Sequence, residues 1–130
     1  KDSSYNLFEN LKIDNFSVLP GSESKLLRGL ELGCSGIITA TCNATSELAR
    51  RVFDDFQNGN EQNVNQKLCD VRNAFEKYNL ISGLHTFFGK NNISYQNLLP
   101  PLSILNHKEA KELNANLKKL NFSTKSFLVA

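Results

Sequence analysis

The stretch KDSSYNLFENLKI places Lys1 immediately before residues that start a helix. A lysine amine attacks a carbonyl carbon once it has lost its proton, and burial favours that step because it disfavours the ammonium form. Taken by itself, Lys1 is a terminal residue, and termini fray. Whether this lysine performs chemistry therefore depends on what the rest of the sequence places beside it.

The other residues with reactive or metal-binding side chains form no recognisable site. His85 and His107 each lack a second ligand at metal spacing, so we expect no metal centre. Cys34, Cys42 and Cys69 contain no CxxC pair and are odd in number, which indicates reduced, buried thiols. Such thiols are typical of a reducing compartment, and we expect a cytoplasmic protein.

Two short apolar runs in the first part of the chain predict buried strands. Residues 16–19 (FSVL) stop at Pro20, and residues 36–42 combine isoleucines with threonines. Helical patterns surround these runs. Their expected starts are Ser3 or Ser4, Ser22, and Thr45 or Ser46.

The second part of the chain predicts helices alone. Apolar residues at helical spacing mark residues 64–78, and a shorter apolar helix follows at residues 80–89. After a loop that contains two prolines, Asn106 and Glu109 form a capping box for a last helix. Strands that alternate with helices indicate an α/β fold with parallel pairing. A sheet of two parallel strands cannot cover its own edges, so we expect a missing upstream half.

Composition excludes two classes of partner. The 15 basic and 13 acidic residues are scattered in ones and twos and give a net charge of +2, which indicates no nucleic-acid interface. No apolar run approaches the roughly 20 residues that span a membrane. We therefore expect a globular protein that binds neither nucleic acid nor membrane.

Four segments resemble one family: KDSS, VLPGSE, LLRGLELGCSGIITATCN and LLPPLSILNHKEAKELNANLKKL. The chain is similar to the C-terminal half of the dihydrodipicolinate synthase/N-acetylneuraminate lyase family of class I aldolases. The family fold is an eight-stranded (β/α)8 TIM barrel with extra C-terminal helices. The resemblance implies the last two barrel strands and their helices in residues 1–58, a three-helix extension in 59–120 and a tail in 121–130.

The resemblance also implies a catalytic role for Lys1. The pair Lys1-Asp2 matches the second half of the family's G-[IV]-K-[DE] motif, whose lysine forms a Schiff base with pyruvate or another 2-oxo acid. The iminium accepts electrons, so a C–C bond next to it forms or breaks without a metal or organic cofactor. Active sites of this fold lie at the C-terminal ends of the strands.

Five further positions are implied to bind substrate. Gly21 matches a glycine that lets the backbone approach the substrate, and Ser22 and Glu23 follow it where the family varies with the substrate's tail. Ile38 matches a residue beside the pyruvyl group, and Ala40 lies further along the same wall. Without the family, Gly21 is a turn glycine, Ile38 a core residue and Glu23 a solvated residue near a helix start.

The resemblance favours an enzyme that condenses or releases pyruvate with an aldehyde, like dihydrodipicolinate synthase or a 2-keto-3-deoxy sugar acid aldolase. The stretch NLISGLH departs from the N-P-x-P-x-K of the synthases and favours the sugar-acid aldolases. An N-acetylneuraminate lyase is an alternative, although such lyases usually carry serine where this chain has Ala40. A non-catalytic binding module and a small helical interaction protein are further alternatives. By resemblance, we expect a homotetramer that requires the N-terminal half of the barrel.

Overall fold

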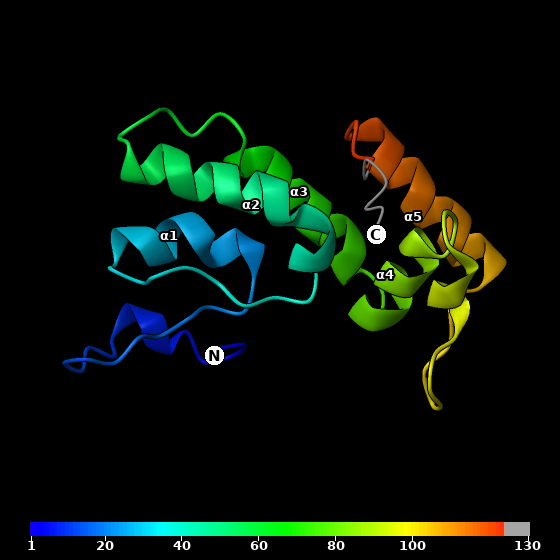
Figure 1. Ribbon diagram of the computed structural model, residues 1–130, viewed down its shortest axis with the longest axis horizontal. Coiled ribbons are helices and arrows are strands. Elements are labelled where there is room, and N and C mark those ends of the chain that lie inside the picture. The colour runs from blue at the N-terminus through cyan, green and yellow to red at the C-terminus, as the bar shows by residue number, and fades with distance from the viewer. Residues whose placement is uncertain (124–130) are drawn as a thin grey trace. The chain divides into compact units, whose positions relative to one another are not determined.

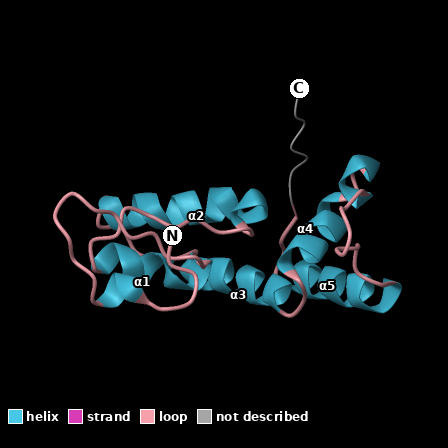
Figure 2. Cartoon of the chain, turned by 90° about the horizontal axis from the view of Figure 1, so that it is seen from below, coloured by secondary structure: helices cyan, strands magenta, loops and turns pink. Residues whose placement is uncertain are grey.

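The computed structural model describes residues 1–123, and these residues form helices but no β-strand (Figure 1, Figure 2). Five α-helices and three short 3-10 helices follow one another within this range. In chain order they are η1 Leu7–Glu9, η2 Glu23–Lys25, α1 Leu26–Glu31, α2 Cys42–Gln57, α3 Asn65–Glu76, α4 Leu80–Phe88, η3 Ile93–Gln96 and α5 His107–Lys119.

The expected fold class, with the last two strands of a TIM barrel, is wrong for the described residues. Residues 16–19 and 36–41 have no regular secondary structure, and Cys42 is already the first residue of α2. The isolated bridge in the described residues is parallel and joins Asp2 to Pro20, outside both segments. A parallel ladder needs successive N–H and C=O groups, and Pro20 has no N–H. Parallel strands must also be covered on both faces, whereas Phe16 is 60% exposed.

The helices around these segments differ from the prediction mainly at their starts. The helix expected from Ser3 or Ser4 is only the single 3-10 turn of η1, which follows Asn6 in a left-handed conformation (φ 52°). Helix α2 begins at Cys42 rather than at Thr45 or Ser46. The hydroxyl of Thr45 does not cap the helix, because it donates to the carbonyl of Thr41 and to a buried carboxylate.

The chain divides into two compact units, residues 1–72 and 73–130. In the first unit, α1 packs against α2, and the start of α3 completes the core. The buried side chains of this core are Leu26, Leu30, Ala49, Val52 and Leu68. Each large apolar side chain that leaves water in this way contributes about 1.5–3 kcal/mol to folding.

The second unit is described up to Ser123 and is built on α4 packed against α5. The rings of Phe75 and Phe87 meet edge to face at 5.6 Å between centroids. The predicted capping box of α5 is confirmed: Asn106 accepts from the Glu109 N–H at 3.0 Å, and Glu109 accepts from the Asn106 N–H at 3.1 Å.

The observed division at residues 72 and 73 does not follow the expected boundary after residue 58. The assignment of 1–58, 59–120 and 121–130 to parts of the family fold stays a prediction, and residues 124–130 of the expected tail lie outside the described residues. Within the described range, no helix is both long enough and apolar enough to cross a membrane.

Candidate functional site

Backbone hydrogen bonds bring together three segments of the first unit that carry predicted site residues. The Asp2 N–H donates to the Leu19 carbonyl at 2.8 Å, and the Gly21 N–H donates to the Asp2 carbonyl at 2.8 Å. On the other side, the Ile38 N–H donates to the Pro20 carbonyl at 3.1 Å. The residue after Lys1 therefore lies beside Gly21, and the Pro20 carbonyl ties Ile38 to the same place.

Two of the predicted site residues at this place are open to solvent. Lys1 is exposed, and Ile38 is 50% exposed. The burial that would favour a neutral lysine amine is therefore not present around Lys1 in the described chain. Ala40 is half-buried, and its carbonyl accepts from the side-chain amide of Asn43 at 2.8 Å.

Asp2 is buried and organises the turn that follows Lys1. Its carboxylate accepts from the N–H groups of Tyr5 at 3.0 Å and Phe8 at 3.4 Å. Burial raises the pKa of Asp2, but the N–H groups of the following turn and the charge of Lys25 outweigh this effect. The pKa of Asp2 therefore lies below its ordinary value.

Gly21 lies against the backbone of the first segment. A Cβ on Gly21 would lie 2.9 Å from Ser3 Cα and 3.1 Å from the Asp2 carbonyl oxygen. Real side chains do not approach so closely, so the position requires glycine for packing between segments. Ser22 follows; it is 7% exposed, and its hydroxyl lies 2.9 Å from the hydroxyl of Ser24.

Glu23 is fully buried, which contradicts the solvated alternative considered for it. One carboxylate oxygen accepts from the hydroxyls of Thr39 at 2.7 Å and Thr45 at 2.9 Å. The other accepts from Arg72 of α3 at 3.5 Å, and the same Arg72 nitrogen donates to the Thr41 hydroxyl at 2.9 Å. We call these five residues the Glu23 cluster.

The Glu23 cluster fixes the segment that follows Ile38. The Thr39 hydroxyl also accepts from the Cys42 N–H at 3.1 Å, so one residue joins the buried carboxylate to the start of α2. An ionised carboxylate in an apolar interior is stable only when it is paired and hydrogen-bonded, and here both conditions hold. Both oxygens of the Glu23 carboxylate are engaged within the cluster, which favours a role in positioning the backbone.

Sequence reasoning identified Glu23 as a site candidate but missed its four partners. One signal was available: Arg72 lies four residues after Leu68 and one after Val71, on the inward side of a predicted helix. A charge on that side needs a buried counter-charge. The three threonines gave no such signal, because threonine is ordinary both in strands and at helix starts.

The cysteines near the cluster are poorly suited to nucleophilic chemistry. Burial, followed by the effect of the Glu23 charge, raises the pKa of the Cys42 thiol despite a hydrogen bond from Thr39. Burial also raises the pKa of Cys69, with smaller contributions from Asp70 and Glu23. All three cysteines are free and half-buried in the described structure. The thiolate is the reactive form, so these shifts disfavour attack at neutral pH.

No group of three or more histidine, cysteine, aspartate or glutamate side chains in residues 1–123 is arranged to hold a metal ion. His85 contacts the carbonyl of Tyr95 through Nδ1, and their rings meet at 6.1 Å between centroids. This contact fits the structural role that the sequence predicts for His85.

Comparison with known proteins places these features in one family. The model of the Dihydrodipicolinate synthetase family matches residues 2–120, which leaves Lys1 just outside the matched range. An uncharacterized DapA-like lyase from Halobacterium salinarum is 27% identical over 105 residues, which cover 78% of this chain and 34% of the relative. The chain therefore spans about a third of the length of this relative.

Solved structures show the same fold relationship. Dihydrodipicolinate synthase DapA-2 from Bacillus anthracis superposes with a TM-score of 0.73 at 19% identity, over 82% of this chain and 38% of that one. YagE from Escherichia coli K12, a prophage protein of the dihydrodipicolinic acid synthase family solved in complex with pyruvate, gives 0.72 at 21% identity. That match covers 83% of this chain and 38% of YagE.

Proposed function

Because the chain belongs to the dihydrodipicolinate synthetase family, we propose that it is part of a class I aldolase that acts through a lysine Schiff base. The observation that carries this proposal is the pairing of Asp2 with Gly21 and of Pro20 with Ile38. These hydrogen bonds bring Asp2, which follows Lys1, close to Gly21 and Ile38, the two residues that the resemblance assigns to the pyruvyl pocket.

The proposed reaction begins with the ε-amine of Lys1. The neutral amine adds to the carbonyl carbon of a 2-oxo acid, and the carbinolamine hydroxyl takes up a proton from solvent and leaves as water, which gives an iminium. The iminium accepts the electron pair of a neighbouring bond, so a C–C bond to an aldehyde carbon breaks or forms through an enamine. Gly21 and Ile38 then border the pyruvyl group, and Ser22 and Ala40 extend the wall.

Glu23 has a different proposed role from these neighbours. It is fully buried and bonded to Thr39, Thr45 and Arg72. We assign it to holding residues 39–41 in place behind Ile38, rather than to direct contact with substrate. This is a positioning role, because a carboxylate with its oxygens engaged has little capacity left for a ligand.

The proposed substrates are pyruvate and an aldehyde. The pyruvate complex of YagE supports the 2-oxo acid, and the departure at NLISGLH supports an aldehyde derived from a sugar acid. No metal or organic cofactor is required, because the lysine iminium supplies the electron acceptor.

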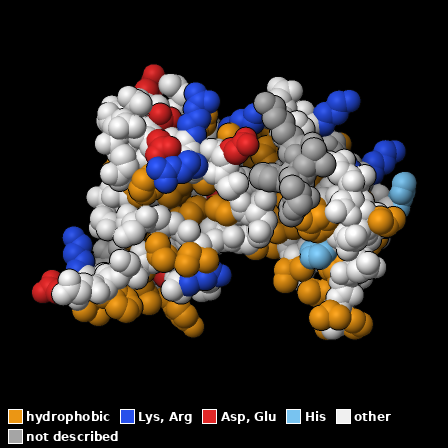
Figure 3. Space-filling view, in the orientation of Figure 1, with side chains coloured by type: hydrophobic (Ala, Val, Ile, Leu, Met, Phe, Trp, Pro, Cys, Tyr) orange, Lys and Arg blue, Asp and Glu red, His pale blue; other side chains and the backbone are white. Residues whose placement is uncertain are grey.

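The proposed partner is the remaining part of a family member. The chain spans 34–38% of the relatives and structures compared above, and apolar side chains of its N-terminal segments are exposed. Figure 3 shows hydrophobic side chains on the surface at the lower left. Ile13, Phe16 and Ile38 are 55%, 60% and 50% exposed. We propose that a further polypeptide segment covers these side chains, and self-association into a tetramer is proposed by resemblance only.

The test is reductive trapping. The purified protein is incubated with pyruvate and borohydride, digested, and examined by mass spectrometry for a reduced pyruvyl adduct on the ε-amine of Lys1. We expect the adduct on Lys1, and we expect Lys1→Arg to abolish it because the guanidinium stays protonated. Lys12→Arg removes an exposed lysine that has no proposed role, and should leave trapping unchanged.

A non-catalytic family member is the second candidate, and the exposure of the Lys1 side chain favours it. The same experiment separates the two. Trapping that is weak, spread over several exposed lysines and insensitive to Lys1→Arg would reject the aldolase and leave a binding role.

A further inference from the structure

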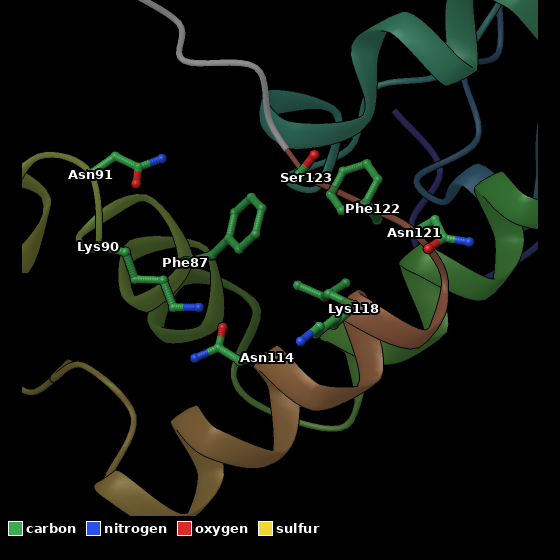
Figure 4. Close-up of a pocket in the computed structure, with 9 residues that line it drawn as sticks. Phe87, Lys90, Asn91, Asn114, Lys118, Asn121, Phe122 and Ser123 are labelled. Carbon is green, nitrogen blue, oxygen red and sulfur yellow. The ribbon is translucent and has the colours of Figure 1, made fainter.

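The second unit contains a cavity of about 560 Å³ that the proposed function does not use. It lies between the end of α4, the C-terminal half of α5 and the residues just after α5 (Figure 4). Cavities of this size accommodate small organic ligands. Its lining combines an apolar wall with lysine and asparagine side chains.

The apolar wall consists of Phe87, Leu117 and Phe122. The rings of Phe87 and Phe122 are stacked, with 5.9 Å between centroids and 22° between planes. Leu117 is 2% exposed and Phe87 is 9% exposed, so this wall is firmly packed. A flat apolar group of a ligand would find a complementary surface here.

A helix-ending motif holds Phe122 in this wall. Asn121 is left-handed (φ 47°), its N–H donates to the Lys118 carbonyl at 3.0 Å, and the Phe122 N–H donates to the Leu117 carbonyl at 3.0 Å. These two bonds define a Schellman motif, in which the residue after the left-handed one packs back onto the last helical turn. The local sequence thus builds the wall without help from the first unit.

The polar side of the cavity is positively charged. Lys90 and Lys118 line it, and none of the described lining residues is acidic. Burial lowers the pKa of Lys90 below its ordinary value, as expected for an ammonium group without a nearby carboxylate. In Figure 4 the side chains of Lys90, Asn114 and Lys118 lie on one side of the cavity, opposite Phe122.

Asn114 adds a polar group that has no internal partner. Its Oδ1 atom is buried and accepts no hydrogen bond from the described residues. Because a carbonyl oxygen only accepts hydrogen bonds, the missing partner of this atom is a donor such as water. A buried polar group left in this way usually signals a missing ligand or water.

We infer that this cavity binds a small organic carboxylate with a flat, ring-sized apolar body. The carboxylate lies between Lys90 and Lys118, and the apolar body packs on Phe87 and Phe122. Charge alone would not use the aromatic wall, and an apolar ligand alone would leave two ammonium groups without a counter-charge.

The test is an NMR titration of the 15N-labelled chain with three probes. Phenylacetate carries both features, phenylacetamide lacks the charge, and inorganic phosphate lacks the apolar body. We expect phenylacetate to shift the amide signals of Lys90, Asn114, Lys118 and Phe122, with a dissociation constant on the order of a millimolar. The other two probes should bind at least about tenfold more weakly.

Matched variants locate the binding. Lys90→Gln and Lys118→Gln should each weaken phenylacetate binding about three- to tenfold. Lys111→Gln, an exposed lysine of α5 outside the cavity, should have no effect. If phenylacetamide bound as tightly as phenylacetate, the site would be an apolar crevice that does not recognise the carboxylate. If phosphate bound as tightly as phenylacetate, the site would be a general cationic patch. Either result, or no saturable shift with phenylacetate, overturns the inference, and none of them bears on trapping at Lys1.

Discussion

At the scale of single residues, the Glu23 cluster is the clearest departure from expectation. A carboxylate expected to be solvated is instead the most buried charge of the first unit, paired with an arginine 49 positions later in the chain. The hydroxyls of Thr39 and Thr45 donate to this carboxylate and offset part of the free energy that its burial costs, and Thr41 accepts from the paired Arg72. The cluster links η2, residues 39–41, α2 and α3, so disrupting it should destabilise the whole first unit.

Removing one partner of the buried pair should strongly destabilise the first unit. Arg72→Met leaves the Glu23 carboxylate buried without its counter-charge, so we expect the free energy of unfolding to fall by about 3–5 kcal/mol. Urea denaturation followed by circular dichroism measures this change. Glu31→Gln breaks the exposed Arg28–Glu31 pair at 3.1 Å and should cost no more than about 1 kcal/mol. Similar losses in the two variants would contradict the interpretation.

Asp2 should make the stability of the chain depend on pH in the acid range. The pKa of Asp2 is lower in the folded state than the ordinary value of 3.8, so near these pH values the folded chain binds fewer protons than the unfolded chain. The stabilisation is therefore fully present above that ordinary value and is lost as the pH falls through the lowered pKa. Thermal melting points measured from pH 6 down to about pH 2 should fall less steeply in Asp2→Asn than in Asp14→Asn. Asp14 is an exposed control, and parallel curves for the two variants would reject this role of Asp2.

At the scale of elements, the close approach of the segments near Lys1 depends on Gly21. Two backbone hydrogen bonds join Asp2 to Leu19 and Gly21, so close packing of the two backbones at Gly21 is also needed to keep the segments together. The helices are more independent, because capping and apolar faces specify each of them locally.

Gly21→Ala should separate the first segment from the second. The new Cβ would lie 2.9 Å from Ser3 Cα, and because this neighbour is backbone, the chain itself must move. We expect a loss of about 1–3 kcal/mol in the free energy of unfolding and faster amide hydrogen exchange at Asp2. Gly83→Ala is the matched control: its Cβ would lie 3.5 Å from the Phe75 ring, so it should be neutral or stabilising. A tolerated Gly21→Ala would show that the segments have room to adjust.

At the scale of the whole molecule, the chain forms two compact units and leaves apolar side chains uncovered. Ile13, Phe16 and Ile38 are 55%, 60% and 50% exposed in the first unit, and Leu99 is 85% exposed in the second. Large exposed apolar patches are typical of surfaces that meet another polypeptide, so these residues are the ones to test for such a role.

Exposed and buried apolar residues should respond oppositely to substitution. Phe16→Ser removes an uncovered side chain, so it should change the free energy of unfolding by less than about 0.5 kcal/mol and reduce binding of the dye ANS. Leu68→Ala empties a fully buried position and should cost about 2–5 kcal/mol. If Phe16→Ser proves as destabilising as Leu68→Ala, Phe16 is covered in solution, and sedimentation velocity would identify self-association as the cause.

The sequence by itself determined the family, most helices and the capping box of α5, because these depend on local patterns. Asn106 and Glu109 lie three positions apart, and residues within a few turns define the apolar face of each helix. The prediction of strands at 16–19 and 36–42 was wrong for the described residues, since a strand exists only when partners far along the chain complete its hydrogen bonds. Isoleucine and threonine favour a strand but do not supply that partner.

The site positions named from the sequence stay predictions, whereas the contacts between their segments come from the tertiary structure alone. Lys1, Gly21 and Ile38 could be named from short motifs, whereas only the tertiary structure revealed that Asp2 and Pro20 hold their segments together. Likewise, Glu23 was visible in the sequence, but its burial and its pairing with Arg72 required the folded chain. A charged side chain becomes buried through contacts between segments that are far apart in the sequence. The spacing of residues along the sequence does not indicate which of these segments lie close together in space.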